Sequence, residues 1–372
     1  MKISIARPRV LRPDGVMLRL FAVLLAALPP LALAAGPAEC APQDGLKPIC
    51  GLHQPGDLEA LPDGRHLLVT QMNMGNTTFG VSWKPGQLTR VDGASGERVP
   101  AYPRPGALVR SNPRKGWGDP ACPEEIGSAL SPGGLHLSRR NDGVWQVLVV
   151  NHGVRESVEF FELGRDGLQW RGCVVAPPTS LLGDVAALPG GAFAATNMID
   201  GHRLDLVARI GAVVARGEDT GFVLTWAPGA GWKQIPGSGG TLPKGIQSDS
   251  DGRHVYYSVG GLRAEVRKVV VATGAQVATA PGLQAERLSW DGRRLLATGF
   301  EGPYRADVCG KVAGHCPAPF HVTALDSSTL ATTRLFRQDG TALEGATVAV
   351  PQGKRWFLGS FISRHILSIP RP

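Results

Sequence analysis

The chain has 372 residues, and its 49 glycines and 30 prolines make up about a fifth of it, more than is usual. The formal net charge is +8, but the basic residues are scattered and form no stripe or cluster. This pattern excludes a nucleic-acid footprint and a polybasic membrane patch, and the turn-rich composition favours many short strands over long helices.

The N-terminus has the pattern of a secretory signal peptide. Basic residues within the first twelve positions precede a 16-residue apolar run, Leu20 to Ala35, which is too short for a comfortable membrane span. Ala32-Leu33-Ala34 fits a small-residue cleavage site. The sequence therefore predicts a signal peptide over 1–34, a single mature domain over 35–372, and a secreted or periplasmic protein. An uncleaved anchor and a start at Met17 are the alternatives.

Six cysteines follow the signal peptide, and their even number points to disulfides in an oxidising compartment. Six cysteines allow fifteen pairings. Short spacings favour one bridge within each of two close pairs and leave the two remaining cysteines for a third bridge. The expected pairs are Cys40–Cys50, Cys309–Cys316 and Cys122–Cys173.

The rest of the chain is a repeat of one β unit. In each copy a short apolar strand, a turn built on Asp-Gly or Gly, and a second apolar strand predict a β-hairpin. Further strand candidates between the hairpins provide about four strands per unit, which predicts an all-β fold, a six-bladed β-propeller; a β-sandwich or two barrels are the alternative. The six hairpins start at Asp57, Gly134, Asp184, Gly245, Arg287 and Gly345.

In a propeller the first strand of each blade lines a central tunnel, so the residues at the starts of these strands face a shared cavity. We therefore expect the chemistry at the hairpin starts rather than at the hairpin turns. Val109 to Ala129 is expected to be a long connection with at most one helical turn.

At the hairpin starts the sequence resembles the paraoxonase/arylesterase family, within the wider group of gluconolactonase and strictosidine-synthase-like propellers. GDLEALPDG, LLGDVAALPGG, LVVNHGVRESVEFFEL and GIQSDSDGRHVYYS match the family's blade pattern, and the resemblance covers roughly Asp57 to Pro370. It implies a six-bladed propeller that holds a small-molecule substrate in its tunnel and hydrolyses esters or lactones.

The resemblance also implies a structural calcium ion deep in the tunnel. Its ligands would be the carboxylates of Asp57 and Asp184 and the backbone carbonyl of Leu135. Hard oxygen ligands of this kind suit calcium. The alternative is that both carboxylates accept hydrogen bonds from backbone N–H groups that face the tunnel.

The family's catalytic calcium ion is expected to be absent. Of the positions that match its ligands only Glu286 offers a carboxylate, whereas Lys244 and Arg287 put cations where a divalent ion would sit. Like charges at such distances repel strongly. We expect Lys244 to take the place of the ion and to pair with Glu286.

His152 matches the second histidine of the family's catalytic pair, but the first histidine matches Gly133. His152 lies with Asn151 and Glu156 in a polar interruption between two apolar strands. It is a candidate for catalysis or for a structural place in the tunnel. His136 is a weak candidate for the missing partner, because alternation along a strand points it away from the face of Gly133.

Two functions stay open from the sequence. One is an exported ester or lactone hydrolase with a rebuilt, calcium-poor site, in which His152, Glu286 and Lys244 are the candidate catalytic residues and Glu286 can act as a general base. The other is a non-catalytic propeller that binds a small molecule in the tunnel or a protein on its loop face.

Overall fold

The protein is described from a computed structural model. The structure describes residues 40, 42, 45–77, 80–106, 112–165, 167–201, 210–302 and 317–372. The predicted signal peptide over 1–34 and the expected Cys309–Cys316 bridge lie outside these residues.

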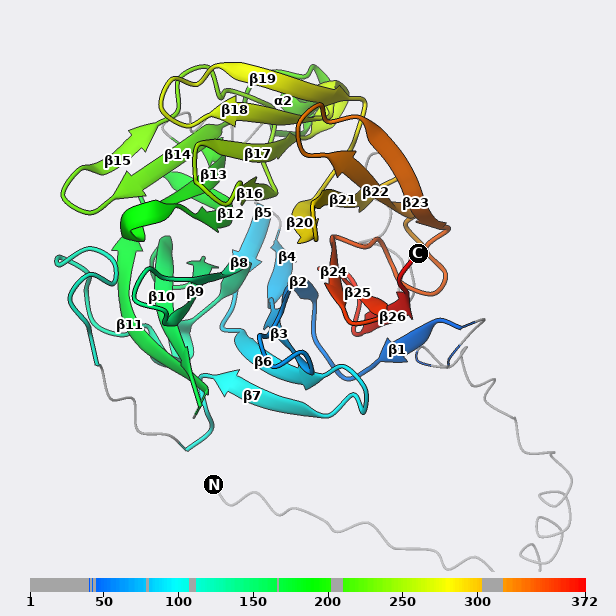
Figure 1. The fold of residues 1–372 in the computed structure, drawn as a ribbon, viewed down its shortest axis with the longest axis horizontal. Helices are drawn as coiled ribbons and strands as arrows, with labels where there is room; N and C mark the ends of the chain where they lie inside the picture. Colours follow the sequence, from blue (N-terminus) through cyan, green and yellow to red (C-terminus); the bar gives the residue numbers. More distant parts are fainter. Residues whose placement is uncertain are drawn as a thin grey trace, which may run out of the picture. The chain divides into compact units, whose positions relative to one another are not determined.

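Six four-stranded antiparallel sheets are arranged as the blades of a β-propeller (Figure 1), which confirms the predicted fold class. Each predicted hairpin forms the two inner strands of one blade. Blade 1 has β2 (Pro55–Ala60), β3 (His66–Gln71), β6 (Gln87–Asp92) and β7 (Arg98–Tyr102); blade 2 has β8 (Pro132–Arg139), β9 (Trp145–Asn151), β10 (Ser157–Gly164) and β11 (Gly167–Val175); blade 3 has β12 (Ser180–Ala187), β13 (Phe193–Asp200), β14 (Phe222–Ala227) and β15 (Gly231–Gln234). Blade 4 has β16 (Ile246–Ser248), β17 (His254–Val259), β18 (Glu265–Val270) and β19 (Gln276–Pro281); blade 5 has β20 (Arg287–Asp291), β21 (Arg294–Phe300), β22 (Phe320–Asp326) and β23 (Thr332–Gln338); blade 6 has β24 (Val348–Gln352), β25 (Arg355–Gly359), β26 (Ile366–Pro370) and β1 (Lys47–Ile49).

The first strands of the blades form a ring. The pairs β2·β8, β8·β12, β12·β16, β16·β20 and β20·β24 are in contact, and β24 contacts β2 to close the circle (Figure 1). Glycines with positive φ make the hairpin turns, as at Gly252 (φ 67°) and Gly292 (φ 65°), where a side chain would be strained. Buried apolar side chains of neighbouring blades pack against each other, such as Phe193 of β13 on Phe160 of β10.

Blade 6 combines the two ends of the described chain. β1 pairs antiparallel with β26, so Lys47 to Ile49 complete a sheet whose other strands come from residues 348–370. The sequence did not predict this strand, because three residues carry too short an alternation to be recognised.

Two of the three expected disulfides are present, Cys40–Cys50 and Cys122–Cys173. The second ties the connection between blades 1 and 2 to β11. Of that connection, the described part contains one short 3-10 turn, Gly127–Ala129, as expected. A two-stranded hairpin, β4 (Met74–Thr77) with β5 (Gly80–Trp83), lies between β3 and β6. No helix in the described residues is long and apolar enough to cross a membrane.

Candidate functional site

The inner strands place the predicted site residues at one end of the ring of first strands, the end at which these strands begin. Lys244 lies two residues before β16, and Glu286 directly precedes β20. His152 directly follows β9, whose last residue pairs with Pro132 at the start of β8. Lys244 and Glu286 come from the neighbouring blades 4 and 5, whereas His152 comes from blade 2, which blade 3 separates from blade 4.

Asp57 and Asp184 have the same set of contacts in different blades. Each carboxylate accepts a hydrogen bond from the next residue of its own strand, and the other oxygen accepts one from the first strand of the following blade. Asp57 Oδ2 accepts the N–H of Leu135 at 2.8 Å, and Asp184 Oδ2 accepts the N–H of Ile246 at 3.1 Å. Both aspartates are buried, so these bonds hold blade 1 to blade 2 and blade 3 to blade 4.

The guanidinium of Arg287 lies between these two carboxylates. Its Nε atom is 3.4 Å from Asp57 Oδ2 and 3.9 Å from Asp184 Oδ2. The N–H of Leu135, rather than its carbonyl, faces Asp57. A donor set that already accepts backbone N–H groups and has a cation within 4 Å does not fit a divalent ion. The calcium ion expected at Asp57, Leu135 and Asp184 stays a prediction that this geometry does not support.

Crowding of carboxylates near the starts of the first strands perturbs their ionisation. Burial, reinforced by the neighbouring Asp184, raises the pKa of Asp57 to about 7, although Arg287 opposes the shift. Glu59, two residues further along β2, accepts the N–H of Leu137, and burial raises the pKa of its carboxyl to about 8. One guanidinium therefore compensates only part of the charge that three ionised carboxylates would carry.

Lys244 and Glu286 form the pair that the sequence predicts. The Lys244 ammonium forms a short ion pair with Glu286 Oε1, and the Glu286 residue is only 5% exposed. Arg287, which the resemblance aligns with the upper ion, contacts instead the two carboxylates expected for the lower one. The backbone of Lys244 is fixed by two bonds, since its N–H donates to Ser258 O and its carbonyl accepts the hydroxyl of Thr196.

His152 is held by a carboxylate on its own loop. Its Nδ1 atom lies 3.0 Å from both carboxylate oxygens of Glu156, and its side chain is 2% exposed. Glu156 also accepts the N–H of Leu182 at the start of blade 3. Asn151 fixes the loop because its Oδ1 atom accepts the N–H groups of Ser131 and Gly153. An imidazole held through Nδ1 by a carboxylate keeps Nε2 available as a proton acceptor.

Two further residues shape the surroundings of His152. The indole of Trp83, from β5, stacks on the imidazole with ring centroids 4.0 Å apart. A Cβ atom on Gly133 would lie 2.6 Å from His152 Nε2, so the imidazole occupies the space where a first histidine would project. Sequence reasoning missed Trp83, and the only signal for Glu156 was its place in the polar interruption.

The predicted residues fall into separate groups. His152 with Glu156, Lys244 with Glu286, and Arg287 with the two aspartates are in contact, whereas no contact in the described part of the chain joins His152 to Lys244 or Glu286. His136 does not approach His152; it lines a cavity that extends to the hairpin turns, lies 3.9 Å from Glu59, and has a pKa lowered to about 4 by burial. A cavity at the hairpin turns was not expected.

Comparisons with known proteins agree on the fold. No family model matches the chain, and no curated protein matches it. Among solved structures, a gluconolactonase from Xanthomonas campestris superposes with a TM-score of 0.52 at 14% identity, over 88% of this chain and 89% of the other. A glucose dehydrogenase gives a TM-score of 0.48 at 14% identity, over 88% of this chain and 99% of the other. At 14% identity, the likeness to the gluconolactonase shows the fold alone and assigns no activity.

Proposed function

We propose that the protein is an exported hydrolase of carboxylic esters or lactones that works without a divalent ion, with its site at the tunnel end where the inner strands begin. The observation that carries the proposal is the buried His152 with Nδ1 bound to Glu156. A histidine oriented by a carboxylate is a recurrent general base. The cationic side chains of Lys244 and Arg287 support the absence of a divalent ion, because they would repel it.

The proposed step is attack of water on the carbonyl carbon of the substrate. His152 Nε2 accepts the proton from water while the new C–O bond forms, and the Lys244 ammonium stabilises the negative charge on the carbonyl oxygen. The bond to the leaving oxygen then breaks, and His152 returns the proton to that oxygen. Glu156 orients the imidazole and Trp83 restrains its ring, while Glu286 holds the ammonium.

The propeller fold is compatible with ester or lactone hydrolysis but does not by itself assign this activity. The Xanthomonas campestris neighbour is named a gluconolactonase and has the same kind of propeller. Export is supported by the Cys40–Cys50 and Cys122–Cys173 bridges, because disulfides persist in oxidising compartments. A small molecule in the tunnel is the proposed partner.

The test is turnover of a panel of lactones and aryl esters by the protein purified from an oxidising compartment, with and without EGTA. We expect chelator-insensitive turnover that falls by about 10²–10⁴-fold in His152→Gln, the usual contribution of a general base. His66→Gln is the matched control, because His66 also bonds a carboxylate through Nδ1, at 2.7 Å from Asp63, but lies in the β2–β3 hairpin.

Three outcomes decide the matter. Turnover that EGTA abolishes contradicts the ion-independent site. Turnover that His152→Gln leaves intact contradicts the role of His152. If the folded protein turns over no member of the panel, the hydrolase proposal fails and the non-catalytic, ligand-binding propeller takes its place.

A further inference from the structure

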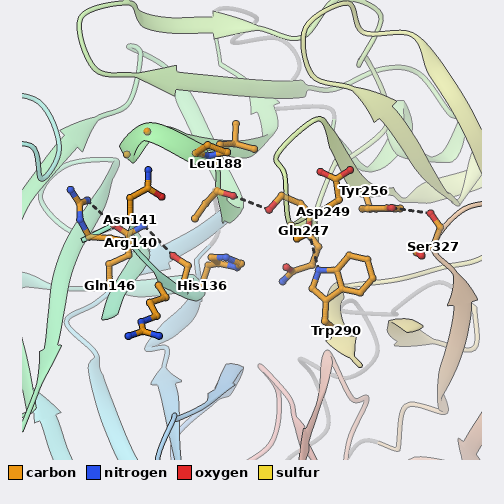
Figure 2. A pocket seen from close by; sticks show the side chains of 18 of the residues that line it. His136, Arg140, Asn141, Gln146, Leu188, Gln247, Asp249, Tyr256, Trp290 and Ser327 are labelled. Atoms are coloured by element: carbon orange, nitrogen blue, oxygen red, sulfur yellow. Dashed lines mark hydrogen bonds between the residues drawn. The ribbon is translucent and has the colours of Figure 1, made fainter. Parts of the chain in front are cut away.

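A cavity of about 860 Å³ extends to the hairpin-turn ends of the inner strands of blades 2 to 5, away from the strand starts that carry His152 and Lys244. Figure 2 shows Arg140, Asn141 and Gln146 along one side, Tyr256, Trp290 and Ser327 along the other, and His136 and Gln247 between them. This volume is within the usual range for small-molecule sites.

Buried polar atoms that line the cavity have no hydrogen-bond partner. They are His136 Nδ1, Arg140 Nε and Gln247 Oε1. The Gln247 residue is 6% exposed, and its Nε2 atom donates to Leu288 O, which fixes its carbonyl oxygen as the free end. Buried polar groups are nearly always paired in folded proteins. His136 Nδ1 lies 3.9 Å from Glu59 Oε1, and Arg140 Nε lies 3.8 Å from Asp142 Oδ2. Of the three atoms, Gln247 Oε1 is therefore the one with neither a hydrogen-bond nor an ion-pair partner among the residues described, and it indicates a ligand that donates a hydrogen bond.

The charge available to a ligand in this cavity is positive. Three arginines, Arg139, Arg140 and Arg293, line the cavity against two aspartates, Asp142 and Asp249. Asp142 Oδ2 lies 3.8 Å from Arg140 Nε, and Asp249 Oδ2 lies 2.7 Å from Nδ1 of His254. Arg293 lies exposed at the rim and has no partner among the described residues. An anionic group on the ligand would find its counter-charge there.

Trp290 provides a rigid aromatic surface. Its indole N–H donates to Ser248 O at 3.0 Å, and the ring of Tyr256 meets it edge-on with centroids 5.5 Å apart. An aromatic ring held in this way can pack against the apolar face of a ligand whose polar groups point sideways.

We propose that this cavity binds a hydroxyl-rich carboxylate, a small sugar acid, independently of the catalytic site at the other end of the tunnel. A hydroxyl group donates to Gln247 Oε1, the carboxylate pairs with Arg293, and the sugar ring packs on Trp290. Hydroxyls are suited to this lining because each can donate and accept at once.

The test is calorimetric titration of the whole protein with D-glucuronate, and with D-glucose as the uncharged counterpart. Glucuronate should bind saturably and more tightly than glucose. Arg293→Ala should weaken glucuronate binding about three- to tenfold and leave glucose binding unchanged, as expected for one exposed charged contact. Gln247→Met should weaken both sugars. Arg293 is on an exposed turn, so this variant tests the proposal even if Gln247→Met fails to fold.

Arg263→Ala is the matched control, because Arg263 is also exposed but lies in the 3-10 turn Gly261–Arg263 between β17 and β18, at the other end of the strands. Three results would overturn the proposal: no saturable binding of either sugar, equal affinity for glucose and glucuronate, or unchanged glucuronate affinity in Arg293→Ala. Loss of ester turnover in Arg293→Ala would contradict the independence of the two sites, whereas failure of the hydrolase proposal alone leaves these binding results unaffected.

Discussion

Replacement of Arg287 by methionine tests what the guanidinium contributes between Asp57 and Asp184. Methionine keeps much of the apolar length of the side chain and removes its charge. At an effective dielectric constant of about 20, unit charges 3.4 Å and 3.9 Å apart attract each other by about 5 and about 4 kcal/mol. Desolvation of the guanidinium offsets part of this attraction, and removal of one partner of a buried pair usually costs about 3–5 kcal/mol.

We therefore expect Arg287→Met to lower the free energy of unfolding by about 3–5 kcal/mol at pH 8. The loss should be smaller at pH 5. Burial and the mutual proximity of the aspartates already raise the pKa of Asp57 to about 7, and without the guanidinium both carboxyls take up protons more readily. Urea denaturation at the two pH values measures the difference. Arg263→Met, at an exposed position, is the control.

Adding or removing calcium distinguishes a site filled by the Arg287 guanidinium from one filled by the calcium ion that the family resemblance implies. If the guanidinium replaces the ion, EGTA leaves the wild-type midpoint unchanged, and millimolar calcium stabilises Arg287→Met by binding between the two uncompensated carboxylates. A wild-type protein that loses several kcal/mol of stability in EGTA, together with a variant indifferent to calcium, would refute the reasoning.

Three further perturbations follow from the contacts. Glu59 is ionised above about pH 4.5 when unfolded but only above about pH 8 when folded, so its contribution makes stability fall as the pH rises between these values; Glu59→Gln should flatten the fall in urea melts at pH 5 and pH 8, and an unchanged slope would contradict the shift. Gly133→Ala places a Cβ atom 2.6 Å from His152 Nε2, so we expect both ester turnover and the melting temperature to drop. Full activity in the variant would show that the imidazole accommodates the added methyl group without losing its function. Cys122→Ala with Cys173→Ala opens a loop of 51 residues, which should cost about 4 kcal/mol in chemical denaturation; a loss below about 1 kcal/mol would indicate that the loop is ordered without the bridge.

The six hairpins could be predicted because their signal is local. An Asp-Gly or Gly turn between two apolar runs specifies a hairpin within about fifteen residues, and each one appears as the inner pair of a blade. The pairing of Lys244 with Glu286 was predicted from the resemblance, which places both at starts of neighbouring first strands. It needed no knowledge of side-chain conformation beyond the order of the blades.

The parts that could not be predicted depend on contacts between distant segments. Trp83 reaches His152 from a hairpin inserted between β3 and β6, about seventy residues away in the sequence, and nothing in its own neighbourhood indicates that destination. The position of Arg287 required knowing that its Nε atom lies beside the carboxylates of Asp57 and Asp184, while its Nη1 atom donates to the carbonyl of Glu286. The cavity at the hairpin turns is formed by four blades together, so no single sequence motif predicts it.

The two cations in the tunnel have different consequences for the chemistry. Arg287 compensates carboxylates that also accept backbone N–H groups from the next blade, so it belongs to the contacts that fix how neighbouring blades are placed. Lys244 pairs with a single carboxylate and its side chain stays 18% exposed, so a substrate oxygen can approach it. Replacing Lys244 should therefore affect turnover more than stability, and replacing Arg287 should do the reverse, because the Arg287 side chain is less exposed, at 12%, and lies between two buried carboxylates.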